Sequence, residues 1–433
     1  MRDSRREVAR FDGVIVLSLL ATGLTHRSVS SYVTVSDLLF GCAIGVAAFR
    51  LMASGARIVV PAWIVPMLLL VMWAAAGATV FLFGYAPPLG AFVASEVGRS
   101  LFGVVFYVGG TVVLWSYGRR IGVQTILRSV VLIGLLSVGA AALLYAASRT
   151  MPSLDPYIKW LAGSRSGVEA RYVSGSSVLR PTGFFAEPAL FGAFQAFSLG
   201  VLLLARQRGC RVSRPALIVL GLSVVVSYSP GAYLIALAGI GAGMVRIGKG
   251  SSLARVHPLR RRPSRALLAL SAIVAVGGIL PSIWDGIDLA IVERSKRAIA
   301  GQDVSANART TTSWEAPLRI VRSSPVVGVG LGNLAPTVEE LSIELKNWRD
   351  LEGAGDGWNG FAWALGSMGL VGMLLLVAFV GKVGTRISFI AAAQLTAFWM
   401  ASSWMLMPLP WVFVFISASL VAAVGRNQEA AAK

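Results

Sequence analysis

Apolar runs of about 20 residues recur along the whole chain, and they limit its possible folds more than any other feature. A helix needs roughly 20 apolar residues to cross the hydrocarbon core of a bilayer. Soluble domains carry about 25% charged residues, whereas this chain is 14% charged and 56% hydrophobic. The sequence therefore predicts an all-α, polytopic membrane protein and excludes a soluble globular fold.

We expect about twelve membrane spans that together form a single transmembrane domain over residues 1–433. The expected spans are 12–25, 36–50, 58–83, 99–117, 121–147, 184–205, 215–229, 231–247, 266–284, 358–381, 387–406 and 408–425. Their interiors are almost free of charge, with Arg128 as the main exception. Charged groups should therefore gather at the ends of the helices.

The net charge of +19 could suggest a nucleic-acid partner, but the placement of the basic residues indicates a membrane topology signal instead. Most Lys and Arg residues lie in short clusters between apolar runs, where they favour the cytoplasmic side of a membrane and contact with the lipid bilayer. We therefore expect both termini on the cytoplasmic side and no nucleic-acid partner. The two cysteines and two histidines are isolated, so no metal site is expected.

Two long loops fall on the opposite side, at 148–183 and 285–357, and the second holds more than half of the 20 Asp and Glu residues. Loops of this length usually carry function or fold locally. In "SWEAPLRIVRSSP" the spacing predicts a short amphipathic helix with Trp314, Leu318 and Val321 on one face. Residues 338–348 show a similar spacing, typical of a helix on the membrane surface.

The stretch "RPTGFFAEPALFGAF" places Arg180 and Glu187 at the start of an apolar run. With Arg171, Arg180 belongs to a basic first loop, and guanidinium groups match phosphate oxygens well. These arginines could bind a phosphorylated lipid, or they could pair with the acidic second loop or with lipid headgroups. Glu187 precedes a proline at the expected helix start and could act as a general base, as a helix cap or as a partner of Arg180. Asp356 is the competing base.

The second loop sets Arg309, Arg319 and Arg322 before the glycine-rich run "GVGLGN". Its glycines, including Gly330, could let the backbone approach a ligand or could simply make a tight turn. No Lys-Ser or Lys-Thr pair follows, so the run is not a P-loop. Arg319 and Arg322 could equally pair with Glu315 along one helix face.

Three stretches over roughly residues 170–375 resemble the bacterial O-antigen polymerases and the related O-antigen ligases. "RPTGFFAEPALFGAF" resembles the segment that enters a span after the first large periplasmic loop. "SYSPGAYLIAL" resembles a Ser-rich turn between two spans, although Pro230 stands where Arg is frequent. The run from Arg309 through "SSPVVGVGLGN" to "GWNGFAWALGSMGLVG" resembles the second large loop and the helix that follows it.

One departure from the ligase pattern is informative. Ligases carry a His followed by Asn, Ser or Gln, then nine residues, then Gly-x-x-Gly. Here the corresponding run is Trp358-Asn359, nine residues, then Gly369 to Gly372, so tryptophan replaces the histidine. Glu187-Pro188 in place of His-Pro, and Arg319 followed after ten residues by Gly330, also look more like polymerases.

The resemblance implies a GT-C-like glycosyltransferase of the bacterial inner membrane with its active site on the periplasmic face. Such an enzyme would transfer a growing polyprenyl-pyrophosphate-linked glycan onto an incoming lipid-linked repeat unit, for O-antigen, capsule or exopolysaccharide. It would need no cofactor and no metal, and its further partners would be a flippase and a chain-length regulator of the same pathway.

The resemblance also assigns expected roles to residues of this chain. Arg180 and Arg309 would bind the pyrophosphate, supported by Arg171, Arg319 and Arg322. Glu187, or Asp356 second, would be the base. The further site candidates are Asn359, Gly330 and Asn333.

Two other functions remain open from the sequence. A ligase would share the fold and transfer the polymer to a lipid or protein acceptor. A flippase of lipid-linked oligosaccharides would be expected to place charges inside its spans, which the sequence does not favour.

Overall fold

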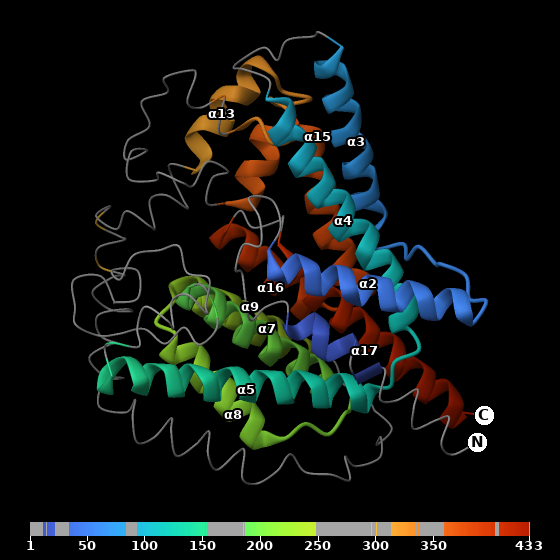
Figure 1. Ribbon diagram of the computed structural model, residues 1–433, viewed down its shortest axis with the longest axis vertical. Coiled ribbons are helices and arrows are strands. Elements are labelled where there is room, and N and C mark those ends of the chain that lie inside the picture. The colour runs from blue at the N-terminus through green and yellow to red at the C-terminus, as the bar shows by residue number, and fades with distance from the viewer. Residues whose placement is uncertain are drawn as a thin grey trace.

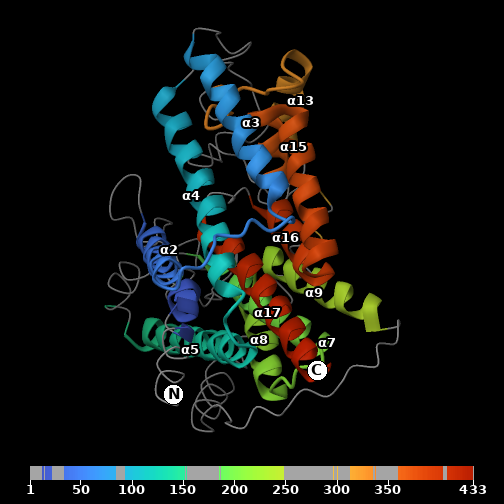
Figure 2. The same cartoon turned by 90° about the vertical axis from the view of Figure 1, so that its right-hand side faces the viewer.

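The computed structural model describes residues 12–13, 15–21, 34–83, 93–151, 153, 185, 187–247, 296, 300, 313–334, 337, 359–402 and 407–432. Within these residues the protein is helical and holds no β-strand, which agrees with the predicted all-α class. The helices are α2 (Val35–Ala53), α3 (Val65–Leu82), α4 (Ala94–Gly118), α5 (Val123–Thr150), α7 (Pro188–Gln207), α8 (Arg214–Val226), α9 (Pro230–Ile247), α13 (Ser313–Ser323), α15 (Gly360–Arg386), α16 (Phe389–Ala401) and α17 (Pro408–Ala432). In Figures 1 and 2, α13 lies at the same end of the molecule as the upper ends of α3 and α15, while α5, α7 and α8 gather toward the other end.

Six of these helices, α2, α4, α5, α7, α15 and α17, are long and apolar enough to cross a membrane. The helices α3, α8, α9 and α16 are apolar but shorter. Apart from α13, each helix coincides with one expected span. The expected span 266–284 lies outside the described residues, so the count of twelve stays a prediction.

The helices α7, α9 and α16 form a tightly packed unit around one polar side chain. Gln394 of α16 lies against Gly200 of α7 and Gly239 of α9, where a Cβ atom at either glycine would overlap its amide group. Its Nε2 donates a hydrogen bond to the carbonyl of Ala196, at 2.7 Å. The two glycines therefore let three helix backbones approach closely, as small residues do in membrane bundles.

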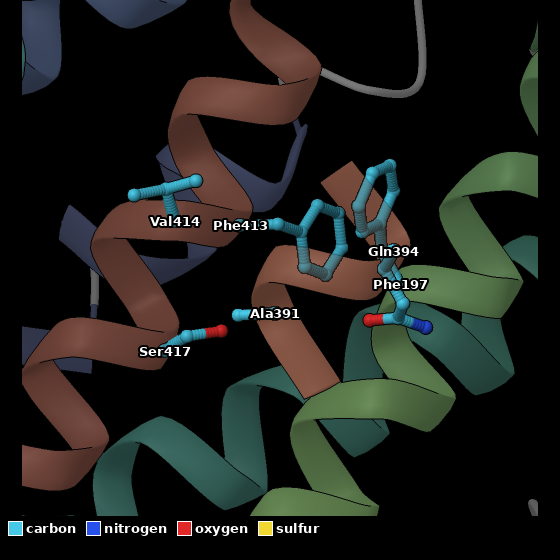
Figure 3. A pocket seen from close by; sticks show the side chains of 6 residues that line it. All are labelled: Phe197, Ala391, Gln394, Phe413, Val414 and Ser417. Carbon is cyan, nitrogen blue, oxygen red and sulfur yellow. The ribbon is translucent and has the colours of Figure 1, made fainter. Parts of the chain in front are cut away.

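A small cavity beside Gln394 shows how completely this core is filled. Phe197, Ala391, Gln394, Phe413, Val414 and Ser417 line it, as Figure 3 shows. Its volume of about 10 Å³ leaves room for roughly one water molecule. The cavity cannot hold a sugar, so it is not the substrate site.

The span expected at 358–381 is not one continuous helix, because α15 folds back on itself at Gly369. The rings of Phe361 and Phe379 lie 6.4 and 6.1 Å from the same ring, that of Trp399. In a straight helix the two phenylalanines would be about 27 Å apart along the axis. Gly369 has φ 67° and ψ −166°, which is not helical. The helix is therefore a hairpin with a first arm at 360–368 and a second arm at 370–386.

Charge inside the expected spans is not limited to Arg128, which lies exposed on α5. The hydroxyl of Tyr117 on α4 donates to the buried carboxylate of Asp12, at 2.6 Å. The hydroxyl of Tyr107 donates to Asp37 in the first turn of α2. These two pairs attach the N-terminal helices to α4, so the carboxylates are paired with hydroxyl groups on a neighbouring helix.

Candidate functional site

The N-terminal ends of α7, α9 and α15 meet beside the C-terminal end of α16. A Cβ atom at Gly192 of α7 would overlap Ser227 and lie 2.5 Å from the Cβ of Ala232 in α9. A Cβ atom at Gly231 of α9 would lie 3.3 Å from the Cβ of Ala401 in α16. The backbone N–H of Gly360 donates to the carbonyl of Ser402, at 3.1 Å. Helix N-termini carry partial positive charge and C-termini partial negative charge, so this meeting point combines three positive ends with the C-terminal ends of α8 and α16.

Glu187 occupies the N-cap position of α7, with extended backbone angles of φ −139° and ψ 150°. Pro188 follows at the first helical position, as the sequence predicts. The Glu187 side chain makes no capping hydrogen bond to the helix. The helix-cap alternative is therefore not supported for the side chain, and the carboxylate stays a candidate for chemistry.

The turn between α8 and α9 brings an unusual residue to the same place. Tyr228 is buried and has φ 48°, a left-handed conformation that is uncommon for a bulky residue. The hydroxyl of Ser227 donates to Val224, at 2.6 Å, and the hydroxyl oxygen of Ser229 accepts from the N–H of Ala232, at 3.4 Å. These bonds end one helix and begin the next, so both serines are occupied by the turn. No sequence pattern indicates the left-handed conformation of Tyr228.

Asn359, expected as a site residue, caps α15. Its Oδ1 accepts from the N–H groups of Phe361 and Ala362, at 3.0 and 3.2 Å. Its Nδ2 donates to the carbonyl of Met400, at 3.3 Å. With only 3% of its surface exposed, Asn359 joins the start of α15 to the end of α16, and its expected place in the substrate site stays a prediction.

The glycine-rich run packs closely against the protein itself. Gly328, Gly330 and Gly332 have φ values of +67°, +92° and +87°. A Cβ atom at Gly328 would overlap the carbonyl of Gly366, and one at Gly332 would lie 2.5 Å from that of Glu96. Gly328 and Gly332 therefore let the run approach the backbones of α15 and α4 closely. A Cβ atom at Gly330 would lie 2.9 Å from the ring of Phe81 in α3, and its expected place in the substrate site stays a prediction.

Asn333 follows this run and is fully buried. Its Oδ1 accepts from the N–H of Val93 at the start of α4, at 3.1 Å, and its Nδ2 donates to the carbonyl of Val329, at 3.2 Å. Both ends of the amide are therefore used to hold the run against α4. Its expected place in the substrate site stays a prediction.

The tip of the α15 hairpin explains why nine residues separate Asn359 from Gly369: they form the first arm. The N–H of Leu370, just past the tip, donates to the carbonyl of Pro325, at 2.8 Å. The N–H of Val329 donates to the carbonyl of Gly366, at 3.0 Å. The spacing that resembles the family pattern therefore has a structural cause in this chain.

Helix α13 confirms the short helix predicted for "SWEAPLRIVRSSP". Arg319 forms an ion pair with Glu315, at 2.6 Å, which is one of the two roles predicted for it from the sequence. Arg319 is half-exposed and Arg322 is exposed. An exposed pair of this kind contributes little to stability, and it leaves Arg319 partly neutralised.

The other expected site residues, Arg171, Arg180, Arg309 and Asp356, lie outside the described residues, as does Trp358. Their roles stay predictions. Among the residues that the structure does describe, no group of His, Cys, Asp or Glu side chains could hold a metal ion.

A family model described as O-antigen ligase matches residues 215–377. This range begins in α8, includes the α8–α9 turn, α13 and the glycine-rich run, and ends in the second arm of α15. No curated protein matches the chain. The match supports a relation to the O-antigen ligase and polymerase family, and it does not distinguish a polymerase from a ligase.

Proposed function

We propose that this chain is a polysaccharide polymerase of the bacterial inner membrane. In this proposal it transfers a growing polyprenyl-pyrophosphate-linked glycan onto an incoming lipid-linked repeat unit at the periplasmic face. The observation that carries the proposal is the match of residues 215–377 to a family of glycan ligases and polymerases. Six helices able to cross a membrane agree with a substrate that is held in a bilayer.

The meeting of three helix N-termini supports a pyrophosphate leaving group at this end of the bundle. When the anomeric C–O bond breaks, the pyrophosphate departs with the electron pair and needs fixed positive charge around it. The ends of α7, α9 and α15 supply partial charges without a metal ion. Arg180 and Arg309 would supply full charges, supported by Arg171 and Arg322. Arg319 contributes less because Glu315 already pairs with it.

Glu187 is the proposed general base. A sugar hydroxyl of the acceptor attacks the anomeric carbon, and its proton passes to the Glu187 carboxylate as the new glycosidic bond forms. Glu187 stands where α7 begins, and its side chain is not used to cap that helix. Asp356 is the second choice for the same role.

The polymerase is favoured over a ligase by Trp358, because an indole ring cannot take up the proton that a ligase histidine would accept. The ligase stays the second candidate, since the matching family model is itself described as O-antigen ligase. In that case the polymer would pass to a lipid or protein acceptor.

Deletion of the gene followed by analysis of cell-surface and lipid-linked glycans tests the proposal. Loss of a polymerase should leave a single capped repeat unit. Accumulation of lipid-linked polymer would instead identify a ligase, and absence of both products outside the cell would identify a flippase.

A further inference from the structure

Helix α13 has two apolar sides, and only one of them packs against the protein. Ser313, Ala316, Pro317 and Ile320 are buried, and Pro317 abuts Gly366 in the first arm of α15. At 100° per residue, Trp314, Leu318 and Val321 lie on an adjacent arc of the helix. Leu318 is 51% exposed. An apolar arc therefore stays open at one side of the contact with α15.

This open arc lies where the lipid-facing surface of α15 ends. Leu370, Leu374 and Val377 follow one another along one face of the second arm and are 47%, 65% and 48% exposed. The second arm is apolar, and an exposed apolar stripe on such a helix in a membrane protein faces lipid. The stripe begins one residue past the hairpin tip, and α13 packs beside that tip, as Figures 1 and 2 show.

Val326 lies close to both helices. It is 49% exposed, and it directly follows Pro325, whose carbonyl accepts the N–H of Leu370. Val326 therefore adds exposed apolar surface beside the start of the second arm, three residues past the end of α13. At 100° per residue, Arg322 lies 40° and Arg319 100° from Leu318, so both arginines border the apolar arc. From this position their long side chains can reach phosphate groups when the helix lies flat at the bilayer surface.

From this arrangement we propose that α13 lies in the headgroup region of the bilayer, with Leu318 and Val326 in contact with lipid and Arg322 at the level of the phosphates. The second external loop would thus be held at the membrane surface. The inference goes beyond the proposed function, because it concerns the depth of α13 and would hold for either a polymerase or a ligase.

Site-directed spin labelling of the full-length protein in anionic phospholipid nanodiscs tests the proposal. Cys42 and Cys210 are the only cysteines of the chain. Both are replaced by alanine so that each variant carries a single label. Burial raises the pKa of the Cys210 thiol, which makes it the slower of the two to react. Single labels are then placed by Leu318→Cys and, as a second position, Val326→Cys. The matched control is Ser323→Cys, on the exposed side of the same helix.

Labels at 318 and 326 should be more accessible to dissolved oxygen than to a water-soluble nickel complex. The label at 323 should show the reverse. Nickel accessibility at 318 and 326 equal to that at 323 would place the arc in water and overturn the proposal. Immobile labels at 318 and 326 that neither reagent reaches would show that protein covers the arc, either this chain or a second copy, and would overturn it as well.

Discussion

Glu187 and Asn359 both occupy the N-cap position of a helix, α7 and α15, and the two helices begin at the same end of the bundle. Asn359 uses both ends of its amide, to cap α15 and to bind the carbonyl of Met400. The Glu187 carboxylate makes no capping bond to α7. The same position at a helix start therefore goes with different uses of the side chain: Asn359 caps its helix and Glu187 does not.

Replacement of Glu187 by glutamine should have the largest effect on the reaction. Loss of a general base typically costs about 10²–10⁴-fold in rate, while the side chain keeps its shape and α7 loses no cap bond. Transfer is measured with purified protein and lipid-linked repeat units, and the thermal midpoint is measured in the same detergent. Wild-type transfer by Glu187→Gln would remove Glu187 from the mechanism.

Replacement of Gly369 by alanine should cause the largest loss of folding stability. Alanine would have to adopt φ 67° and ψ −166°, and its Cβ would overlap the carbonyl of Val326 and approach that of Pro325 to 2.8 Å. We expect a loss of about 3 kcal/mol or more, seen as little folded protein after extraction. Gly381 on the same helix is the matched control, because a Cβ there meets nothing within 4 Å. Gly381→Ala should be neutral or stabilising by up to about 1 kcal/mol.

Asn359→Ala should separate stability from activity. Loss of the cap costs about 1–2 kcal/mol, and the carbonyl of Met400 loses a donor. The thermal midpoint should fall, while transfer per folded molecule should change far less than in Glu187→Gln. If the folded Asn359→Ala protein lost as much transfer activity as Glu187→Gln, Asn359 would have a direct role in the reaction.

The smallest effect is expected from Arg319→Gln. Breaking an exposed ion pair four residues apart on a helix costs about 0.3–0.5 kcal/mol, and Glu315 already neutralises much of this charge. Transfer by Arg319→Gln should therefore stay closer to wild type than transfer by Arg322→Gln. Equal losses in the two variants would show that the pair with Glu315 does not limit the contribution of Arg319.

The positions of most helices followed from hydrophobic length, because a segment such as Pro188–Gln207 has no other way to satisfy its backbone in lipid. The hairpin in α15 could not be predicted this way. Both of its arms are apolar, and the turn depends on one backbone conformation at Gly369 and on contacts with Pro325 and Val326, which are distant in sequence.

In the candidate site, too, local sequence patterns predicted some features, and others depended on contacts between distant residues. The start of α7 and the pairing of Arg319 with Glu315 followed from local rules for prolines and for charges four residues apart. The roles of Asn333 and Gly330 depended on partners in α4, α3 and α15 that no local pattern reveals. Asn333 bonds to backbone groups of the protein itself, and Gly330 packs against the ring of Phe81.

The central claim is that this chain elongates lipid-linked glycans. It is tested most directly by incubating the purified protein in nanodiscs with a synthetic polyprenyl-pyrophosphate repeat unit and resolving the products by size. The proposal predicts a ladder of lipid-linked oligomers that is lost in Glu187→Gln. The opposite result has two parts: the protein forms no polymer from repeat units alone, and it transfers a preformed lipid-linked polymer to a lipid acceptor. That result would contradict the proposal and identify a ligase.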